Sequence, residues 1–206
     1  MHRVIFTAFN VLCLRNILPG ARVLEIGATA DAQTLLCLPA LAQATLRVGT
    51  NREKMQHGNG LNLVQVGADS LACFADSSFD AVLCNSALEH DPMFWRTLQQ
   101  INRVARPGAV LVIGVPGYCE TAPPWLLRWT RWRGIRRVIN RIAPGFMASA
   151  PTLLIHNFPG DYYRFSPQAM REVLLAGCND IQIQTLLHPP RIIGFGRCAK
   201  ANGHDG

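Results

Sequence analysis

The sequence has no closely spaced pair of cysteines, although it contains seven cysteines among its 206 residues. Structural zinc sites need ligands at shorter spacing. The odd number of cysteines, with Cys84 inside an apolar run typical of a core strand, favours reduced thiols over a disulfide framework. We therefore expect a protein with no bound metal and without the disulfide-dense architecture of small secreted domains.

Long apolar stretches and sequence repeats are also missing. No apolar run approaches the roughly 20 residues that a membrane-spanning helix needs, and no segment is repeated or of low complexity. Residues 1–14 superficially resemble a secretory leader, but the small-x-small site at 28–30 follows the first strand pattern. Cleavage there would remove that strand, so we expect an amphipathic first helix ending at Pro19-Gly20 and a cytoplasmic protein.

Acidic residues are absent from 123–145, where six arginines occur. The whole chain has 20 basic and 13 acidic residues, and the two signs nearly balance once this segment is set aside. The basic character is therefore local. Apolar residues recur in the segment at spacings of three and four, a pattern that predicts an amphipathic helix. They are Trp125, Trp129, Trp132, Ile135, Ile139 and Ile142.

With 49% hydrophobic residues the chain can bury a sizeable core, and strand and helix patterns alternate along it. Short apolar runs suited to buried strands occupy 22–26, 46–50, 61–66, 80–85, 109–115, 181–187 and 192–198. Asp31 is the expected N-cap of a helix that runs to Leu38 and is closed by Pro39. Further helices are predicted over 94–104 and from Ser166-Pro167 to Ala176.

The helix over 94–104 connects two strand patterns into one right-handed β-α-β unit. Prolines at the reversal 188–190 favour an antiparallel pair of strands at the sheet edge. The order of elements predicts a single α/β domain over 1–206: a Rossmann-like open twisted sheet of seven mostly parallel strands with an antiparallel C-terminal hairpin, helices on both faces and a helical insertion, 120–150, after the fifth strand. Residues 201–206 are expected to form a disordered tail.

Ligands in such sheets bind beyond the carboxyl ends of the strands. Asn85, Ser86, Glu89 and His90 follow the end of the strand pattern at 80–85. His90 is the candidate general base, because an imidazole titrates near neutral pH. The alternative is that 89–91 only structures the turn into the next helix.

A second cluster of candidate residues precedes the helix that begins after Ser166. His156 and Tyr163 are catalytic candidates here, if the segment folds over the sheet as part of an acceptor pocket. The same segment could equally be a structural anchor, with Tyr163 buried and Arg164 paired to Asp161. Both interpretations stay open at this point.

Five strings in this order, RVLEIGA, SSFDAV, ALEHDP, RVARPGAVLVI and DYYRFSPQAMREVLLAGC, resemble the class I S-adenosylmethionine-dependent methyltransferases. The resemblance is to the branch that commonly modifies small molecules, and it covers about 21–198 apart from the insertion. It implies S-adenosylmethionine as cofactor, S-adenosylhomocysteine as product, and methyl transfer by in-line displacement to a small or lipid-linked acceptor, for which we expect oxygen to be the modified atom.

The resemblance also implies which residues contact the cofactor. These are Glu25, Gly27, Ala28 and Thr29 at the methionine part, Asn51 at the ribose, Ala68 or Asp69 at the adenine, and Asn85 with Ser86 beside the transferred methyl. His90 would lie on the acceptor side.

Departures from the family pattern support two further hypotheses. The turn after the first strand has Thr29 and Asp31 where glycines are usual, and Asn51 replaces the usual ribose-binding acid. A neutral hydrogen bond contributes about 1 kcal/mol, whereas one to a charged group contributes about 1.5–3 kcal/mol. The chain could therefore be a non-catalytic relative that serves as a partner or scaffold, or an enzyme that uses the same cofactor for another reaction, such as cyclisation.

Three roles compete for the Trp/Arg-rich insertion at 120–150. It could be a lid over the acceptor site, as insertions after the fifth strand often are in methyltransferases that resemble this chain. Residues 123–142 could instead lie on the anionic inner surface of a membrane, where each basic residue contributes about 1 kcal/mol. Contact with nucleic acid ranks last, because the rest of the chain supplies no basic groove. The oligomeric state is left open.

Overall fold

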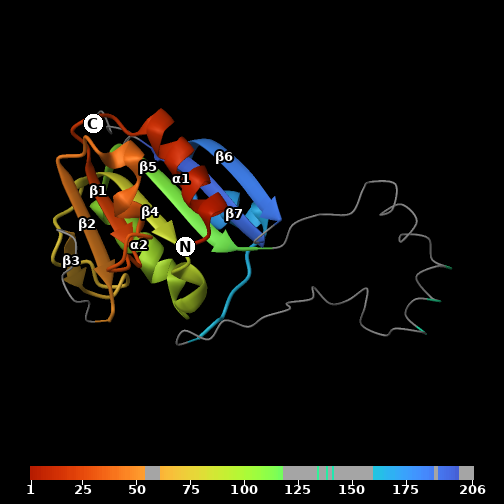
Figure 1. Ribbon diagram of the computed structural model, residues 1–206. Coiled ribbons are helices and arrows are strands. Elements are labelled where there is room, and N and C mark those ends of the chain that lie inside the picture. The colour runs from red at the N-terminus through yellow and green to blue at the C-terminus, as the bar shows by residue number, and fades with distance from the viewer. Residues whose placement is uncertain are drawn as a thin grey trace, which may run out of the picture.

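The computed structural model describes residues 1–53, 61–117, 160–187 and 190–199, together with the single positions 134, 138 and 141. These residues form a seven-stranded sheet with the order β3-β2-β1-β4-β5-β7-β6 (Figure 1). The strands are β1 (Arg22–Ile26), β2 (Leu46–Asn51), β3 (Asn62–Gln65), β4 (Phe79–Asn85), β5 (Ala105–Pro116), β6 (Cys178–Leu187) and β7 (Pro190–Cys198).

The pairing of strands confirms the predicted fold class. β1 pairs in parallel with β2 and β4, and the same direction continues to β3 and β5. β7 is antiparallel to both of its neighbours, β5 and β6. β6 is therefore the outer strand of an antiparallel C-terminal hairpin, as the prolines of the reversal indicated.

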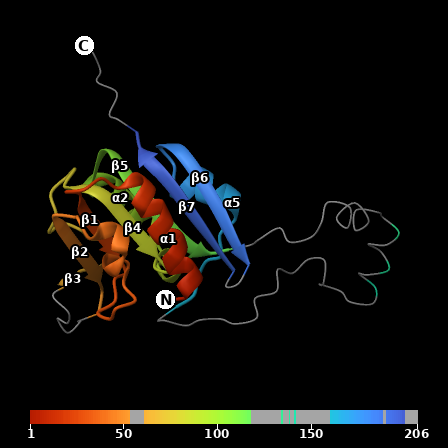
Figure 2. The same cartoon turned by 45° about the horizontal axis from the view of Figure 1, so that its top comes forward.

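Helices cover both faces of the sheet. α1 (Arg3–Asn16) lies across one face, over β4, β5 and β7, as Figure 2 shows. The 3-10 turns η1 (Leu35–Cys37) and η2 (Pro39–Leu41) pack on this same face. The opposite face is covered by α2 (Phe94–Val104), α5 (Pro167–Ala169) and the π-helical turn η4 (Met170–Leu174).

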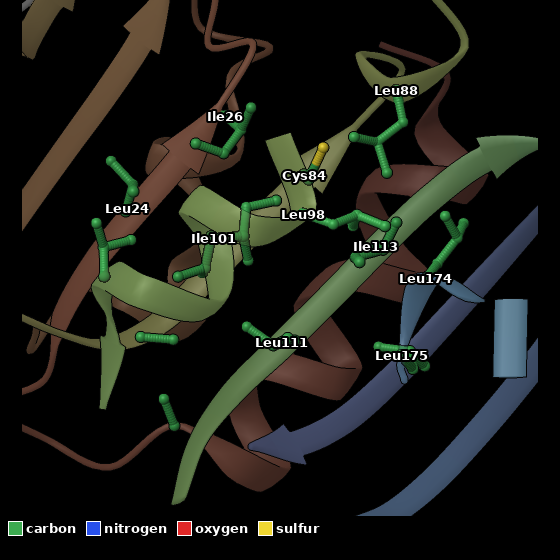
Figure 3. Close-up of a cluster of buried hydrophobic side chains, with 14 of the residues drawn as sticks. Leu24, Ile26, Cys84, Leu88, Leu98, Ile101, Leu111, Ile113, Leu174 and Leu175 are labelled. Carbon is green, nitrogen blue, oxygen red and sulfur yellow. The ribbon is translucent and has the colours of Figure 1, made fainter. Parts of the chain in front are cut away.

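Alternation of side chains along the strands divides the core into two layers. In β1, Val23 faces α1, whereas Leu24 and Ile26 belong to the layer under α2. The spacing of three in α2 places Leu98 and Ile101 on one face of the helix. Figure 3 shows this layer, in which Leu98 lies beside Ile113 of β5. Both faces of the parallel strands are thus buried, which explains their continuous apolar sequences.

The expected helix from Asp31 to Leu38 is wrong. The segment forms the two short turns η1 and η2, and Pro39 begins the second turn instead of closing a helix. Thr34, not Asp31, caps η1. The physical reason is that the Glu25 carboxylate, supplied by β1, accepts from Leu35 N at 3.0 Å and Leu36 N at 3.1 Å and fixes the start of η1 there.

The helix predicted from Ser166 is confirmed in its start and modified in its form. The Ser166 side chain accepts a hydrogen bond from Ala169 N, and Gly177, with a φ of 78°, lies beyond its end. Between them only α5 is α-helical, and η4 is π-helical. The helix predicted at the N-terminus is confirmed as α1, which ends before Pro19-Gly20.

The described residues on either side of the insertion meet at the carboxyl edge of the sheet. Phe165 N donates to Pro116 O at 3.1 Å, and Gly117 forms a bridge with Phe165. The expected amphipathic helix at 123–142, apart from the single positions 134, 138 and 141, lies outside the described residues, as do His156 and the tail at 201–206. Within the part of the chain that is described, no helix has the length and hydropathy required to span a membrane.

Candidate functional site

The carboxyl ends of β1, β2, β4 and β5 lie along one edge of the sheet and bring the candidate residues together. Gly27, directly after β1, has a φ of 75° and donates from its backbone N to Thr50 O at 2.8 Å. A Cβ at this position would lie 3.0 Å from Ala87 Cβ. The turn therefore needs glycine both for its left-handed backbone and for the close approach of the loop after β4.

The turn after β1 is not blocked by its two unusual side chains. Thr29 Oγ1 donates to Asp31 Oδ1 at 2.9 Å, and both residues are exposed. Ala28, between Gly27 and this pair, is buried. The two larger side chains thus bond to each other at the surface, so this turn can still present its backbone to a ligand.

Glu25 is turned toward η1. Its carboxylate accepts hydrogen bonds from Leu35 N at 3.0 Å, from Leu36 N at 3.1 Å and from the Thr34 hydroxyl. The side chain is 4% exposed, and burial raises the pKa of Glu25 to about 7, against the three hydrogen bonds that favour the charged form. These hydrogen bonds hold the Glu25 carboxylate at the N-terminus of η1. The expected contact of Glu25 with a cofactor stays a prediction.

The raised pKa of Glu25 predicts a pH dependence of stability. A carboxyl with a raised folded-state pKa binds its proton more tightly in the folded protein, so its contribution is full below pH about 4.5 and is lost as the pH rises toward 7. We expect the free energy of unfolding of the wild type, relative to Glu25→Gln, to fall by about 3 kcal/mol across this range. Urea denaturation at several pH values measures the difference. The exposed Glu172→Gln variant is the control, and equal pH profiles for both variants would contradict the prediction.

Asn51 joins the first turn to the end of β2. Its Nδ2 donates to Ala28 O at 2.9 Å, and its Oδ1 accepts from Glu53 N at 3.1 Å. Asp69, after β3, pairs with Arg52 at 3.2 Å, and Ala68 packs against the core. The sequence analysis did not single out Arg52. Its position directly after Asn51, the candidate ribose-binding residue, was the one available signal.

The end of β4 carries an unusual backbone and an unpaired polar atom. Ser86 has a φ of 57°, and its N donates to Gly114 O at 3.0 Å. Such a conformation is uncommon for a residue with a Cβ and is concentrated at functional sites. The buried Asn85 Oδ1 has no hydrogen-bond partner in the part of the chain that the structure describes. This orphaned acceptor, beside the strained residue, fits a site for a polar ligand.

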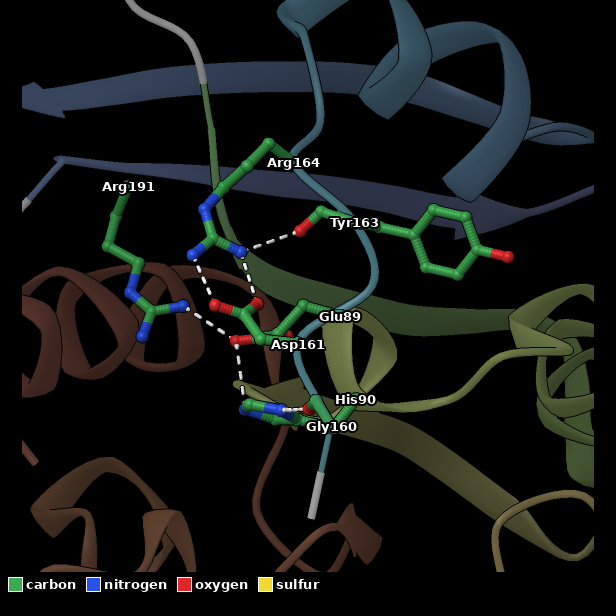
Figure 4. Close-up of polar contacts among 7 residues, drawn as sticks. All are labelled: Glu89, His90, Gly160, Asp161, Tyr163, Arg164 and Arg191. Atoms are coloured by element: carbon green, nitrogen blue, oxygen red, sulfur yellow. Dashed lines mark hydrogen bonds and ion pairs between the residues drawn. The ribbon is translucent and has the colours of Figure 1, made fainter. Parts of the chain in front are cut away.

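A buried charged network lies beyond β4, in the turn η3 (Leu88–His90) (Figure 4). Glu89, whose side chain is 2% exposed, accepts at Oε1 from the Arg191 guanidinium at 3.1 Å. His90 Nε2 lies 3.9 Å from the same oxygen, and His90 Nδ1 bonds to the carbonyl of Gly160. A carbonyl can only accept, so Nδ1 carries the hydrogen of this bond, and Nε2 is the ring nitrogen that can exchange a proton.

Residues 160–165, which we call the strap, cross over η3. Tyr162 N donates to Glu89 O at 2.8 Å, and the Tyr163 hydroxyl donates to Pro92 O at 2.8 Å. Arg164 makes a two-pronged ion pair with Asp161. The Arg164–Asp161 pair confirms the structural interpretation of this segment in part, while Tyr163 is half-buried and not fully enclosed. Its ring packs on Phe94, with centroids 5.0 Å apart.

Arg191 is a further residue of the candidate site that sequence reasoning missed. It is the second residue of β7 and lies opposite Pro116, at the carboxyl end of β5. Because β7 is antiparallel, its beginning lies at the edge where the parallel strands end. The proline-rich reversal at 188–190 was the signal that could have located it. Among the described residues, no group of three or more His, Cys, Asp and Glu side chains is placed to hold a metal ion.

Comparison with known proteins agrees with this architecture. Residues 30–113 match a family model described as a methyltransferase domain. The demethylmenaquinone methyltransferase of Corynebacterium urealyticum is 29% identical over 128 residues, which are 55% of this chain and 52% of the relative. The enzyme of that name from Staphylococcus haemolyticus is 39% identical over 67 residues, 32% of this chain and 27% of the relative. The chain thus spans about half, or less, of the length of these relatives.

Among solved structures, the 1,6-didemethyltoxoflavin-N1-methyltransferase of Burkholderia thailandensis has the same fold with a TM-score of 0.64. The identity is 16%, and the match covers 95% of this chain and 78% of that one. That structure contains bound 1,6-didemethyltoxoflavin and S-adenosylhomocysteine. The match to the methyltransferase-domain model is confined to 30–113, and the solved enzyme shares the fold of this chain.

Proposed function

We propose that the protein transfers a methyl group from S-adenosylmethionine to a small or amphiphilic acceptor. The observation that carries the proposal is the open turn after β1, in which Gly27 keeps the required backbone and Thr29 bonds to Asp31 at the surface. Asn51, Asp69 and the unpaired Asn85 Oδ1 lie along the same strand ends. The family-model match over 30–113 supports the same function.

The proposed cofactor contacts follow the strand ends. The turn from Gly27 to Thr29 would hold the methionine part, Asn51 the ribose hydroxyls, and Ala68 or Asp69 the adenine. Asn85 and Ser86 would border the reacting methyl, which the bound sulfonium supplies as an electrophile. The protein's own task is to align acceptor and methyl and to exclude water.

We propose oxygen as the modified atom, because His90 can act as the general base for a hydroxyl. The Gly160 carbonyl orients the ring through Nδ1, so a proton taken from the acceptor would reside on Nε2. The buried Glu89 carboxylate, 3.9 Å from Nε2, would stabilise the imidazolium that forms. Arg191 donates a hydrogen bond to the same carboxylate, which limits how strongly Glu89 would attract the proton on His90 Nε2. His156 and Tyr163 stay secondary candidates on the acceptor side.

The insertion is proposed to close the acceptor site or to contact a membrane. The described residues that flank it, Gly117 and Phe165, pair at the carboxyl edge of the sheet, and the strap contacts η3 there. A segment that leaves and returns at this edge can cover an acceptor. The names of the two relatives, both demethylmenaquinone methyltransferases, support a small amphiphilic acceptor and hence a cytoplasmic protein that touches the inner membrane surface peripherally through 123–142.

Calorimetric titration with S-adenosylhomocysteine tests the function, and His90→Asn tests the base. The asparagine keeps an N–H donor for Gly160 O but has no basic nitrogen. We expect the wild type and the variant to bind S-adenosylhomocysteine equally, and turnover of the variant to fall by about 10²–10⁴-fold at saturating substrate.

Negative results in the two experiments lead to different conclusions. No binding by the wild type at millimolar concentration would contradict the methyltransferase and leave a non-catalytic partner of this fold. Binding with unchanged turnover in His90→Asn would show that the loop is structural. Mass analysis of the product would identify the modified atom and would expose a different reaction, such as cyclisation.

A further inference from the structure

Cys178 and Cys198 face each other across the two strands of the C-terminal hairpin. The register of β6 and β7 pairs Cys178 directly with Cys198, at the open end of the hairpin away from its reversal. Figure 2 shows β6 and β7 side by side at the edge of the sheet. The two residues stand 20 positions apart in sequence, so only the strand pairing brings them together.

The backbone hydrogen bonds identify the closer of the two kinds of antiparallel pair. Ala199 N donates to Gly177 O at 3.0 Å, and Cys178 N donates to Leu175 O at 3.0 Å, so the two cysteines do not exchange backbone bonds with each other. In such a pair the Cα atoms lie about 4.5 Å apart and the side chains are at their closest. A disulfide spans Cα atoms about 4.4–6.8 Å apart, so this geometry lies within its reach.

Packing places both thiols on the same face of the hairpin. Cys178 and Cys198 are half-buried against the core layer that contains Leu175. Gly196, two residues before Cys198 and on its side of the strand, leaves room for the partner: a Cβ there would lie 2.8 Å from Cys178 Cβ and 3.3 Å from its Sγ. The lack of a side chain at 196 therefore makes space for the Cys178 sulfur.

The two thiols also interact directly. The pKa of Cys198 is lowered because the Cys178 thiol donates a hydrogen bond to it, and the pKa of Cys178 is raised by the same bond and by burial. We take Cys198 as the attacking thiol of the pair, and the single variants below test this assignment. By contrast, burial raises the pKa of Cys13 to about 12, which makes that thiol unreactive.

We propose that Cys178 and Cys198 form a reversible redox site that takes low-molecular-weight disulfides as its oxidant. The Cys198 thiolate attacks one sulfur of oxidised glutathione, which forms a mixed disulfide and releases one glutathione thiolate. Cys178 then loses its proton and attacks Cys198 Sγ, which forms the intramolecular disulfide and expels the second glutathione. Two protein thiols are oxidised, and one glutathione disulfide is reduced to two glutathione molecules.

The disulfide would tie the open end of the edge hairpin. Strand ends at a sheet edge are where fraying begins, and the cross-link would restrict the unfolded chain between 178 and 198. Arg191 lies near the other end of β7, so oxidation is expected to leave the carboxyl edge of the sheet unchanged. The proposal therefore stands apart from the methyltransferase function and can be tested without any activity measurement.

The test uses the full chain, reduced, desalted, incubated under native conditions with excess oxidised glutathione and then blocked with N-ethylmaleimide. Trypsin separates the two cysteines into peptides 172–191 and 198–200, so a linked peptide reports the disulfide directly. We expect this linked peptide to accumulate and the melting temperature of the oxidised protein to rise by about 5–10 °C.

Three single variants sharpen the result. Cys178→Ser should stop at the glutathione adduct on Cys198, and Cys198→Ser should react at least about tenfold more slowly at Cys178. Cys73→Ser, which removes an exposed thiol elsewhere, should form the cross-link as the wild type does. The proposal is overturned if the wild type yields only glutathione adducts, or if both thiols stay reduced when Cys73 has reacted completely.

Discussion

Replacement of Arg191 by methionine is expected to lower the free energy of unfolding by about 3–5 kcal/mol. Glu89 is 2% exposed, and its Oε1 accepts a hydrogen bond from Arg191 at 3.1 Å. Its Oε2 has no hydrogen-bond partner within the described residues, so the loss of Arg191 removes a main source of compensation for a buried charge. Urea denaturation at neutral pH measures the loss of free energy. Thermal denaturation should show a melting temperature roughly 10 °C lower.

The chain offers a matched control for this prediction. Arg52 and Asp69 form an ion pair of similar length, 3.2 Å, but their side chains are 56% and 33% exposed. Arg52→Met should therefore cost at most about 1 kcal/mol. In the double variant Glu89→Gln with Arg191→Met, much of the lost stability should return, because no charge is left buried. Equal losses in Arg191→Met and Arg52→Met would show that Glu89 does not depend on Arg191.

Gly27→Ala is expected to weaken S-adenosylhomocysteine binding by more than about tenfold and to destabilise the fold by about 1–3 kcal/mol. The residue has a φ of 75°, and the added Cβ would lie 3.0 Å from Ala87 Cβ. The methyl group must move either the turn after β1 or the loop after β4, and both border the proposed cofactor site. Calorimetric titration and thermal denaturation of the same preparation separate the two effects.

Gly20→Ala separates backbone strain from damage to the site. Gly20 also has a left-handed backbone, with a φ of 81°, but a Cβ there would meet nothing within 4 Å. The Gly20→Ala variant should lose about 1–2 kcal/mol of stability and keep its affinity for S-adenosylhomocysteine. If the two variants bind the ligand equally well, the turn after β1 does not form part of the cofactor site.

Local patterns were enough to predict most of the elements. The strand at 22–26 and the helix at 94–104 have the predicted bounds, because each carries an apolar periodicity that only one regular structure can bury. The exception is 31–38, where two short turns replace a helix. There the deciding contacts come from Glu25, ten and eleven residues before the amides of Leu35 and Leu36 that it binds. A capping rule applied at Asp31 could not include a carboxylate supplied by the neighbouring strand.

The candidate site was predictable in position and only partly in its contacts. The expectation that a site lies after β4 followed from the fold class, because ligands bind where parallel strands end. The bonds that define the site cross long distances in the sequence: His90 is joined to Gly160 over 70 residues, and Glu89 to Arg191 over 102. No local pattern contains such information.

The sequence by itself determined the order of strands and helices, the α/β class and the edge of the sheet at which to look for a site. These depend on hydrophobic periodicity and on turn residues, which are properties of neighbouring positions. Only the tertiary structure decided that Arg191 faces Glu89, that Glu25 turns toward η1, and that Cys178 meets Cys198. The reason is that strand register sets which distant side chains share a face, and register is a property of the assembled sheet.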